Sequence, residues 1–240
     1  MKKTIVLALA VVIAAFSLAF LLIGGDNSKN GGSSYAQLGE TKGRVGAVIQ
    51  FGGLNWRVLD VQGKRALIIT ENIIELRRYN VELKEVTWET CTLRKYLNGE
   101  FYAKFTKEDQ GRIAETKITN PYNLWYGAKG GNDTTDKIFL LSLEEADKYF
   151  GNSGDYFNRI RKEYKEGKWI PANNGYGFSN ANDSGRIAKY NDKASWWWLR
   201  SPGSIGFFAA HVFDDGIVLV LGDFVAYDEI GVRPALWLNL

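Results

Sequence analysis

Few side chains in this chain could carry nucleophilic or metal chemistry, because it contains a single His and a single Cys. A Ser-His-Asp or Cys-His catalytic set would have to use His211, which lies in the strand-like stretch 209–212 without a nucleophile motif beside it. We therefore interpret His211 as an ordinary core or surface histidine. Cys91 lies among apolar neighbours with helical spacing, which predicts a buried and inert thiol. The same counts exclude an internal disulfide and a Cys/His zinc site.

The remaining candidates for chemistry are carboxylates. The run 130–133, followed by Asp136, resembles a loop that could hold calcium through oxygen ligands, but it lacks the EF-hand spacing and we interpret it as a polar turn. The pair Asp214-Asp215 precedes a glycine and predicts a hairpin turn, and the pair Glu144-Glu145 follows a serine and predicts a helix start. We expect no metal, no cofactor and no catalytic residues, and therefore no enzyme.

The elements that must position these residues belong to a globular chain of 240 residues with 45% hydrophobic and 24% charged content. The formal net charge is +3, and Lys2 and Lys3 contribute two of these charges at the N-terminus. Because no basic stripe is left in the rest of the chain, we expect no nucleic-acid partner. The aromatic content of 14%, with eight Trp, is high and indicates either a Trp-rich core or an aromatic contact surface.

The N-terminus has the order of a membrane-targeting segment. Lys2 and Lys3 precede an apolar run over residues 4–23, long enough as a helix to span about 30 Å of hydrocarbon. We expect residues 1–23 to be a signal-anchor, with a cleaved signal peptide as the alternative. The segment 24–41 is rich in Gly, Ser and Asn and predicts a flexible linker, so the folded domain would cover residues 42–240. The positive N-terminus predicts a single-pass protein of the cell membrane with this domain outside the cell, or a secreted protein after cleavage.

Within the domain, β-branched runs and capping signals alternate in a way that predicts an α+β fold. Strands are expected at 45–51, 54–61, 65–70, 138–141, 196–200 and 232–238, with a hairpin turn at 214–216. Helices are expected at 87–105, 106–113, 142–150 and 156–166, and a long irregular region at 171–193. Because strands lie at both ends of the domain, we expect the terminal strands to pair with each other.

Five segments in this order resemble a bacterial family of unknown function, DUF6273. They are Phe51-Gly52 with Trp56-Arg57-Val58-Leu59, Thr87-Trp88-Glu89 leading to 93–98, the run 136–142, the run 197–203, and Gly231-Val232-Arg233-Pro234-Ala235-Leu236. The resemblance implies a fold related to C-type lectins and formylglycine-generating enzymes, without a known activity. The calcium-lectin signatures, the lectin disulfides and the cysteines of formylglycine-generating enzymes are absent.

The C-terminal stretch 204–228 combines two kinds of residue. Val212, Gly216, Val218, Gly222 and Val225 have the types of a structural framework. Between them lie the candidate ligand-binding residues Phe207, Phe208, His211, Phe213, Asp214, Ile217, Leu219, Leu221, Asp223, Phe224, Ala226 and Tyr227. Both faces of the strand around Val218 are apolar, which fits either a strand buried on both sides or an exposed apolar patch.

Most of these candidate residue types can arise from Asn codons altered at their adenines, and no Lys, Gln, Trp or Met occurs between 204 and 228. In this respect the stretch resembles the C-terminal variable region of proteins diversified by retroelements, in which a lectin-like scaffold displays randomised residues. The sequence therefore predicts a surface-displayed domain that recognises a protein or glycan through the 204–228 face. The alternatives are an enzyme acting on cell-wall or surface polymer, with a polar pocket in 171–193, and a structural surface protein without a ligand.

Overall fold

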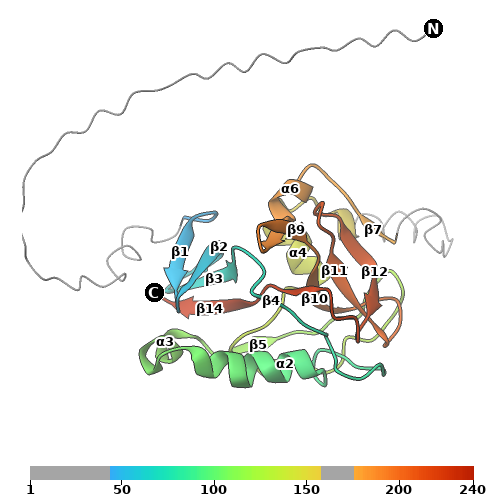
Figure 1. Cartoon of the computed structure of the whole chain (residues 1–240). Coiled ribbons are helices and arrows are strands. Elements are labelled where there is room, and N and C mark those ends of the chain that lie inside the picture. The colour runs from blue at the N-terminus through green and yellow to red at the C-terminus, as the bar shows by residue number, and fades with distance from the viewer. Residues whose placement is uncertain (1–43, 158–175) are drawn as a thin grey trace, which may run out of the picture. The chain divides into compact units, whose positions relative to one another are not determined.

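The computed structural model describes residues 44–157 and 176–240, which belong to one unit of the chain (Figure 1). The predicted signal-anchor at 1–23, the linker at 24–41 and most of the predicted helix 156–166 lie outside these residues. Among the residues described, no helix has both the length and the apolar character needed to cross a membrane.

The N-terminal strands and the last strand of the chain form one antiparallel sheet. Its order is β1 (Val48–Phe51), β2 (Leu54–Gln62), β3 (Arg65–Thr70) and β14 (Ala235–Asn239). The Gly52-Gly53 turn lets β1 and β2 pair from Phe51 with Leu54 onward, and both glycines have positive φ. The sequence correctly placed β2 and β3. The last strand, β14, shares this sheet as expected, but it pairs with β3, and the first strand, β1, lies at the opposite edge, so the terminal strands do not pair directly.

The candidate residues lie on a second sheet of six strands. Its order is β4 (Glu75–Leu76), β13 (Gly231–Val232), β10 (Trp197–Pro202), β11 (Phe208–Val212), β12 (Val218–Phe224) and β7 (Gly177–Phe178). Two-stranded ribbons add β5 (Thr116–Ile118) with β6 (Thr134–Asp136), and β8 (Ala188–Tyr190) with β9 (Lys193–Ser195). The predicted hairpin turn joins β11 to β12, where the amide of Gly216 donates to the carbonyl of Phe213.

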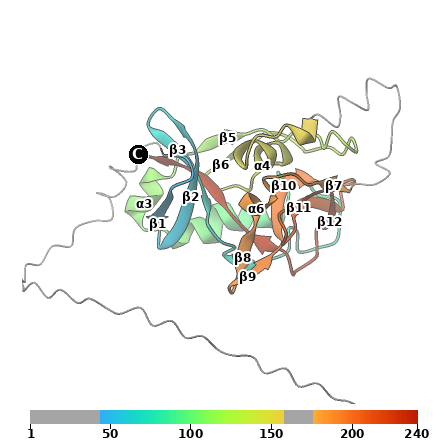
Figure 2. The same ribbon diagram turned by 90° about the horizontal axis from the view of Figure 1, so that it is seen from above.

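Short helices flank the two sheets. They are α2 (Thr92–Tyr96), the π-helical η1 (Leu97–Phe101), the 3-10 helix η2 (Tyr102–Lys104), α3 (Lys107–Arg112), α4 (Leu143–Tyr149) and α6 (Asp183–Arg186). In Figure 1 the run from α2 to α3 lies along one side of the molecule, and Figure 2 shows it beneath the sheets from above. Both predicted capping sequences cap helices: Thr106 accepts from the amide of Asp109, and Ser142 forms a complete capping box with Glu145.

Two buried arginines connect the sheets to their surroundings. Arg200 donates to the carbonyls of Leu140 and Thr119 and forms an ion pair with Glu145. Arg233 has no exposed surface and donates to the carbonyls of Thr70, Glu71 and Arg186. Each guanidinium thus donates to two or more backbone carbonyls, which is how a buried arginine is tolerated.

Several expected boundaries were wrong. Residues 87–90 form a turn, and α2 begins only at Thr92, with Cys91 as its N-cap. The apolar run 138–141 is buried but makes only an isolated bridge, Phe139 to Ala235, instead of a strand. The expected strand 232–238 is split into β13 and β14, with Pro234, which has no amide hydrogen to donate, between them.

The polar region 171–193 was expected to be irregular. Its described part, from Tyr176 onward, contains β7, α6 and β8 and begins β9. These elements were missed because they are only two to four residues long, and β7 in addition pairs with β12, some 40 residues later. The coarse prediction holds: the described residues form a mixed α+β structure made mostly of sheet.

Candidate ligand-binding face

Burial separates the stretch 204–228 into nearly the same two groups, framework and candidate ligand-binding residues, as the residue types do. All five predicted framework residues are buried. The candidate residues that are exposed or half-buried are Phe207, Phe208, Phe213, Asp214, Ile217, Leu219, Leu221, Asp223, Phe224, Ala226 and Tyr227. On β12 this means that Val218 and Val220 face the core while Ile217, Leu219 and Leu221 remain partly accessible. Many of the side chains that reach the surface are therefore aromatic or apolar.

Part of the face is an aromatic group built from β11 and the residue before β10. Trp196 stacks on His211 with ring centroids 5.2 Å apart, and Phe213 meets both rings edge-on at 4.8 and 4.9 Å. The indole Nε1 of Trp196 donates to Asp214 across 3.3 Å, which fixes the outer ring. Leu219 lies opposite His211 on the neighbouring strand. These contacts give the group one defined shape.

His211 is the exception among the candidate residues, because its side chain has no exposed surface. Neither of its ring nitrogens has a hydrogen-bond partner, and burial lowers its pKa to about 4 despite the opposing attraction of Asp223. The structure thus corrects the expectation that His211 contacts a ligand directly. The neutral imidazole packs against Trp196 and Phe213 and supports them from within.

A second aromatic pair lies where β11 begins and β12 ends. Phe208 and Phe224 are paired in register and meet edge-on, with centroids 4.7 Å apart. Phe224 is 49% exposed and Tyr227, three residues later, is 38% exposed. The hydroxyl of Tyr227 donates to Glu229, and this hydrogen bond raises the pKa of the phenol. Rigid, exposed rings of this kind lose little entropy when a partner covers them.

The segment 78–86 adjoins this pair and was missed by the sequence reasoning. The amide of Asn80 donates to the carbonyl of Val225, and Arg78 forms an ion pair with Asp228. The segment places Val81 and Leu83 at the surface, with 60% and 55% exposure. These two apolar residues alternate with charged ones, which is a usable signal, but their proximity to Val225 depends on a contact about 145 residues away in the chain.

One buried amide anchors the loop ends behind the face. Asn123 is fully buried, and its Nδ2 donates to the carbonyls of Pro202, Gly203 and Val220 at 2.9 to 3.0 Å. Val220 lies where the register of β11 and β12 shifts, and Pro202 and Gly203 lie at the end of β10, where its register with β11 also shifts. Asn123 therefore replaces the missing ladder bonds and keeps the irregular strand ends in place.

The charge of the face is one-sided. Between Ser201 and Val232 there is no Lys or Arg, whereas the stretch contains Asp214, Asp215, Asp223, Asp228 and Glu229. Four of these carboxylates are exposed and Asp223 is half-buried. Among the described residues, Arg78 forms an ion pair with Asp228, and the other carboxylates of the stretch leave an excess of negative charge beside the aromatic rings. Such a surface attracts cationic groups and repels anionic ones.

The structure also shows where the other candidates for chemistry lie. Cys91 is buried and burial raises its pKa to about 12, so the thiol is protonated and inert, as predicted. Asp136, the last residue of β6, accepts hydrogen bonds from Trp88, Arg94 and Thr134, so its carboxylate has a structural role. In the part of the chain that is described, no group of three or more His, Cys, Asp or Glu side chains could hold a metal ion.

The enzyme alternative requires a cleft that contains a carboxylate with a raised pKa. A crevice of about 310 Å³ beside α4 is lined by Glu144, Glu145 and Asp147. Burial raises the pKa of Glu144, and the neighbouring Glu145 raises it further. Glu145 and Asp147 have structural roles, however, because Glu145 pairs with Arg200 and Asp147 accepts from Ser153. One carboxylate remains, and acid-base hydrolysis of a glycosidic bond uses two.

The described residues form a mixed α+β structure whose 204–228 stretch presents aromatic and apolar side chains at the surface. The chain matches the family model described as "Domain of unknown function (DUF6273)" over residues 63–240, and it belongs to this family. The match confirms the family resemblance, but it begins after Phe51-Gly52 and the run 56–59, which were part of that resemblance. No curated protein and no solved structure matches this chain.

Proposed function

We propose that this chain is a surface-displayed binding domain that recognises a protein or glycan through the 204–228 face. The observation that carries the proposal is the division of this stretch into a buried framework and an accessible set of aromatic and apolar side chains. Soluble domains rarely leave such a set uncovered unless it contacts a partner. Segment 78–86 extends the contact area with Val81 and Leu83.

The charge of the face narrows the ligand class. Carboxylates beside exposed aromatic rings suit Arg and Lys side chains, which pair with the former and stack on the latter. An acidic glycan would be repelled by the same carboxylates. Among the ligands considered, the face therefore favours a protein with a basic surface.

The C-type-lectin-like fold and the retroelement origin are parts of the same proposal. The pairing of β3 with β14 supports a fold in which both ends of the domain share a sheet. The separation of displayed from framework residues supports diversification, because a displayed residue can change without loss of the core. The test is at the nucleotide level: we expect a near-copy of the last coding segment, rich in Asn codons, downstream and beside a reverse-transcriptase gene. A genome with neither would contradict the origin and leave the binding proposal standing.

Cellular location follows from the N-terminal segment. We propose that residues 4–23 anchor the protein in the cell membrane and that the linker holds the domain outside the cell, with secretion after cleavage as the alternative. Protease treatment of intact cells tests this arrangement, since an outward-facing domain would be degraded without lysis.

The binding proposal is tested with the full-length chain and three surfaces: a glycan array, the producing bacterium and a neighbouring species. We expect saturable binding to at least one, lost when Phe224 and Tyr227 are both replaced by Ser. Val48→Ser is the matched control, because Val48 is 50% exposed but lies on the other sheet. Equal binding by the double variant, or no saturable binding to any surface, would contradict the proposal, and the second result would favour a structural surface protein.

A further inference from the structure

A crevice of about 280 Å³ lies between the four-stranded sheet and the helical run α2–η2, outside the 204–228 face. Leu54, Ile74, Phe101 and Phe105 form its apolar walls. Its shape depends on Gly52, where an added Cβ would lie 2.2 Å from the ring of Phe105. The volume approaches the lower end of the range for small-molecule sites, which are typically about 300 Å³ or larger.

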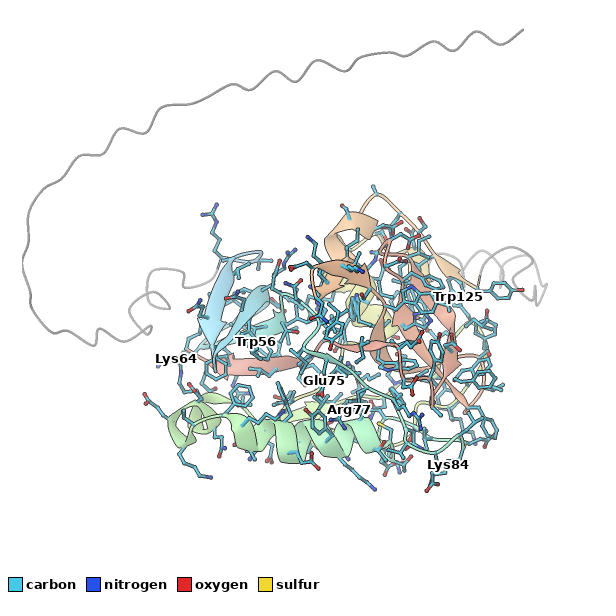
Figure 3. The ribbon with its side chains drawn as sticks, in the orientation of Figure 1. Trp56, Lys64, Glu75, Arg77, Lys84 and Trp125 are labelled. Atoms are coloured by element: carbon cyan, nitrogen blue, oxygen red, sulfur yellow. The ribbon has the colours of Figure 1, made fainter. Side chains whose placement is uncertain are left out.

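Two opposite charges line this crevice without pairing with each other. Lys104 donates from Nζ to the hydroxyl of Tyr96 across 3.2 Å. Glu75 accepts from Arg77 through Oε2, whereas its Oε1 is out of contact with solvent and has no hydrogen-bond partner. The guanidinium of Arg77 lies 3.6 Å from the centre of the Tyr96 ring, which holds Glu75 in position through Arg77. In Figure 3, Glu75 and Arg77 lie in the middle of the molecule, next to the helical run.

A buried carboxylate oxygen without a donor is unfavourable, since it has lost its hydration and gained nothing in return. A cationic ligand group at this oxygen would supply the missing donor. Lys104, whose side chain lies at the exposed rim, could at the same time bind an anionic group of the same ligand. The Tyr96 hydroxyl interacts with both charged groups, because it accepts from Lys104 and its pKa is raised by Glu75, so a ligand that binds both must carry its two charges close together.

We propose that this crevice binds a free α-amino acid with an apolar or aromatic side chain. Its ammonium would donate to Oε1 of Glu75, its carboxylate would accept from Lys104, and its side chain would lie against Phe101 and Phe105. Burial and the interaction of its hydroxyl with Glu75 raise the pKa of Tyr96, so the hydroxyl is protonated at neutral pH. This site goes beyond the binding face and does not depend on it.

Isothermal titration of the full-length chain with L-phenylalanine and L-leucine tests the proposal. We expect saturable binding with a Kd between about 10 μM and 1 mM, a range that suits a small ligand with two charge contacts. N-acetyl-L-phenylalanine lacks the ammonium and phenethylamine lacks the carboxylate, and each should bind at least about tenfold more weakly.

The variants Glu75→Gln and Lys104→Met should each weaken L-phenylalanine binding by about tenfold or more. Lys64→Met is the matched control, since Lys64 is an exposed lysine in the turn between β2 and β3, at the end of that sheet in Figure 3. If Glu75→Gln fails to fold, the test rests on Lys104→Met. Because Lys104 is exposed, this variant should have the melting temperature of the wild type.

Three results would overturn the proposal: no saturable binding of either amino acid up to about 10 mM, equal binding of the acetylated analogue, or equal weakening by Lys64→Met. The double variant Phe224→Ser/Tyr227→Ser should bind L-phenylalanine like the wild type. This variant changes only the 204–228 face. A negative result with the amino acids would therefore contradict the crevice proposal and not the binding proposed for that face.

Discussion

The buried imidazole of His211 predicts that the domain loses stability in mildly acidic solution. Burial lowers the pKa of His211 from its ordinary value of 6.5 to about 4 in the folded state. In the unfolded chain the imidazole takes up a proton as the pH falls below about 6.5, whereas in the folded protein it stays neutral until about pH 4. Over this interval the unfolded state binds more protons, so stability falls as the pH falls.

The size of the loss follows from the two pKa values. One pKa unit corresponds to about 1.4 kcal/mol, so His211 should reduce the free energy of unfolding by about 2 kcal/mol at pH 5 and by about 3 kcal/mol at pH 4, relative to pH 8. For a domain of this size, 1 kcal/mol corresponds to about 2–4 °C in melting temperature. The acid shift at pH 5 should therefore be readily measurable.

Urea unfolding, followed by tryptophan fluorescence, measures this effect in the wild type and in His211→Leu between pH 4 and pH 8. Carboxylates titrate in both proteins, so the difference between the two free energies isolates the imidazole. We expect this difference to move by about 3 kcal/mol in favour of the leucine variant as the pH falls from 8 to 4. Parallel curves would refute the reasoning, since they would show that the imidazole titrates with its ordinary pKa.

Three substitutions test the framework. Asn123→Ala removes the donor shared by three buried carbonyls and should lower the free energy of unfolding by about 3 kcal/mol, measured by urea denaturation. Gly216→Ala should lower it by at least about 2 kcal/mol in calorimetry, because φ is 89° and the new Cβ would lie 1.9 Å from the carbonyl oxygen of Asp183. Glu145→Gln keeps a capping side chain but removes the charge partner of Arg200, and thermal unfolding should show a loss of about 2 kcal/mol. An unchanged midpoint in any of the three would contradict the corresponding contact.

The parts of the fold that could be predicted from the sequence are those determined by local chemistry. Strand β3 begins where it was expected because the glycine-containing turn 62–64 separates its β-branched run from β2. The helix caps at Thr106 and Ser142 could be predicted because a cap involves only residues within one turn. Strand β7 could not be predicted, since Gly177 and Phe178 are extended only because they pair with Val218 and Leu219, some 40 residues later.

The same distinction applies to the candidate face. The alternation of Val218 and Val220 with accessible neighbours follows from the period of a strand and was visible in the sequence. The burial of His211 could not be predicted from the sequence. It depends on Trp196, which stacks on the imidazole and lies just before β10, the strand next to β11. Likewise, the crevice at Glu75 requires the helix that carries Tyr96, and no local pattern brings these two residues together.

Burial explains how such a face could vary without loss of the fold. Phe224 is half-exposed, so its replacement removes only part of the free energy that a fully buried phenylalanine contributes, about 3–5 kcal/mol on truncation. Val225, the next residue, is completely buried and is held through its backbone by both Phe207 and Asn80. The backbone that presents Phe224 is thus fixed by groups that do not depend on the identity of its side chain. A binding surface built in this way can change its contacts while its geometry stays constant, which is the property that recognition of different partners requires.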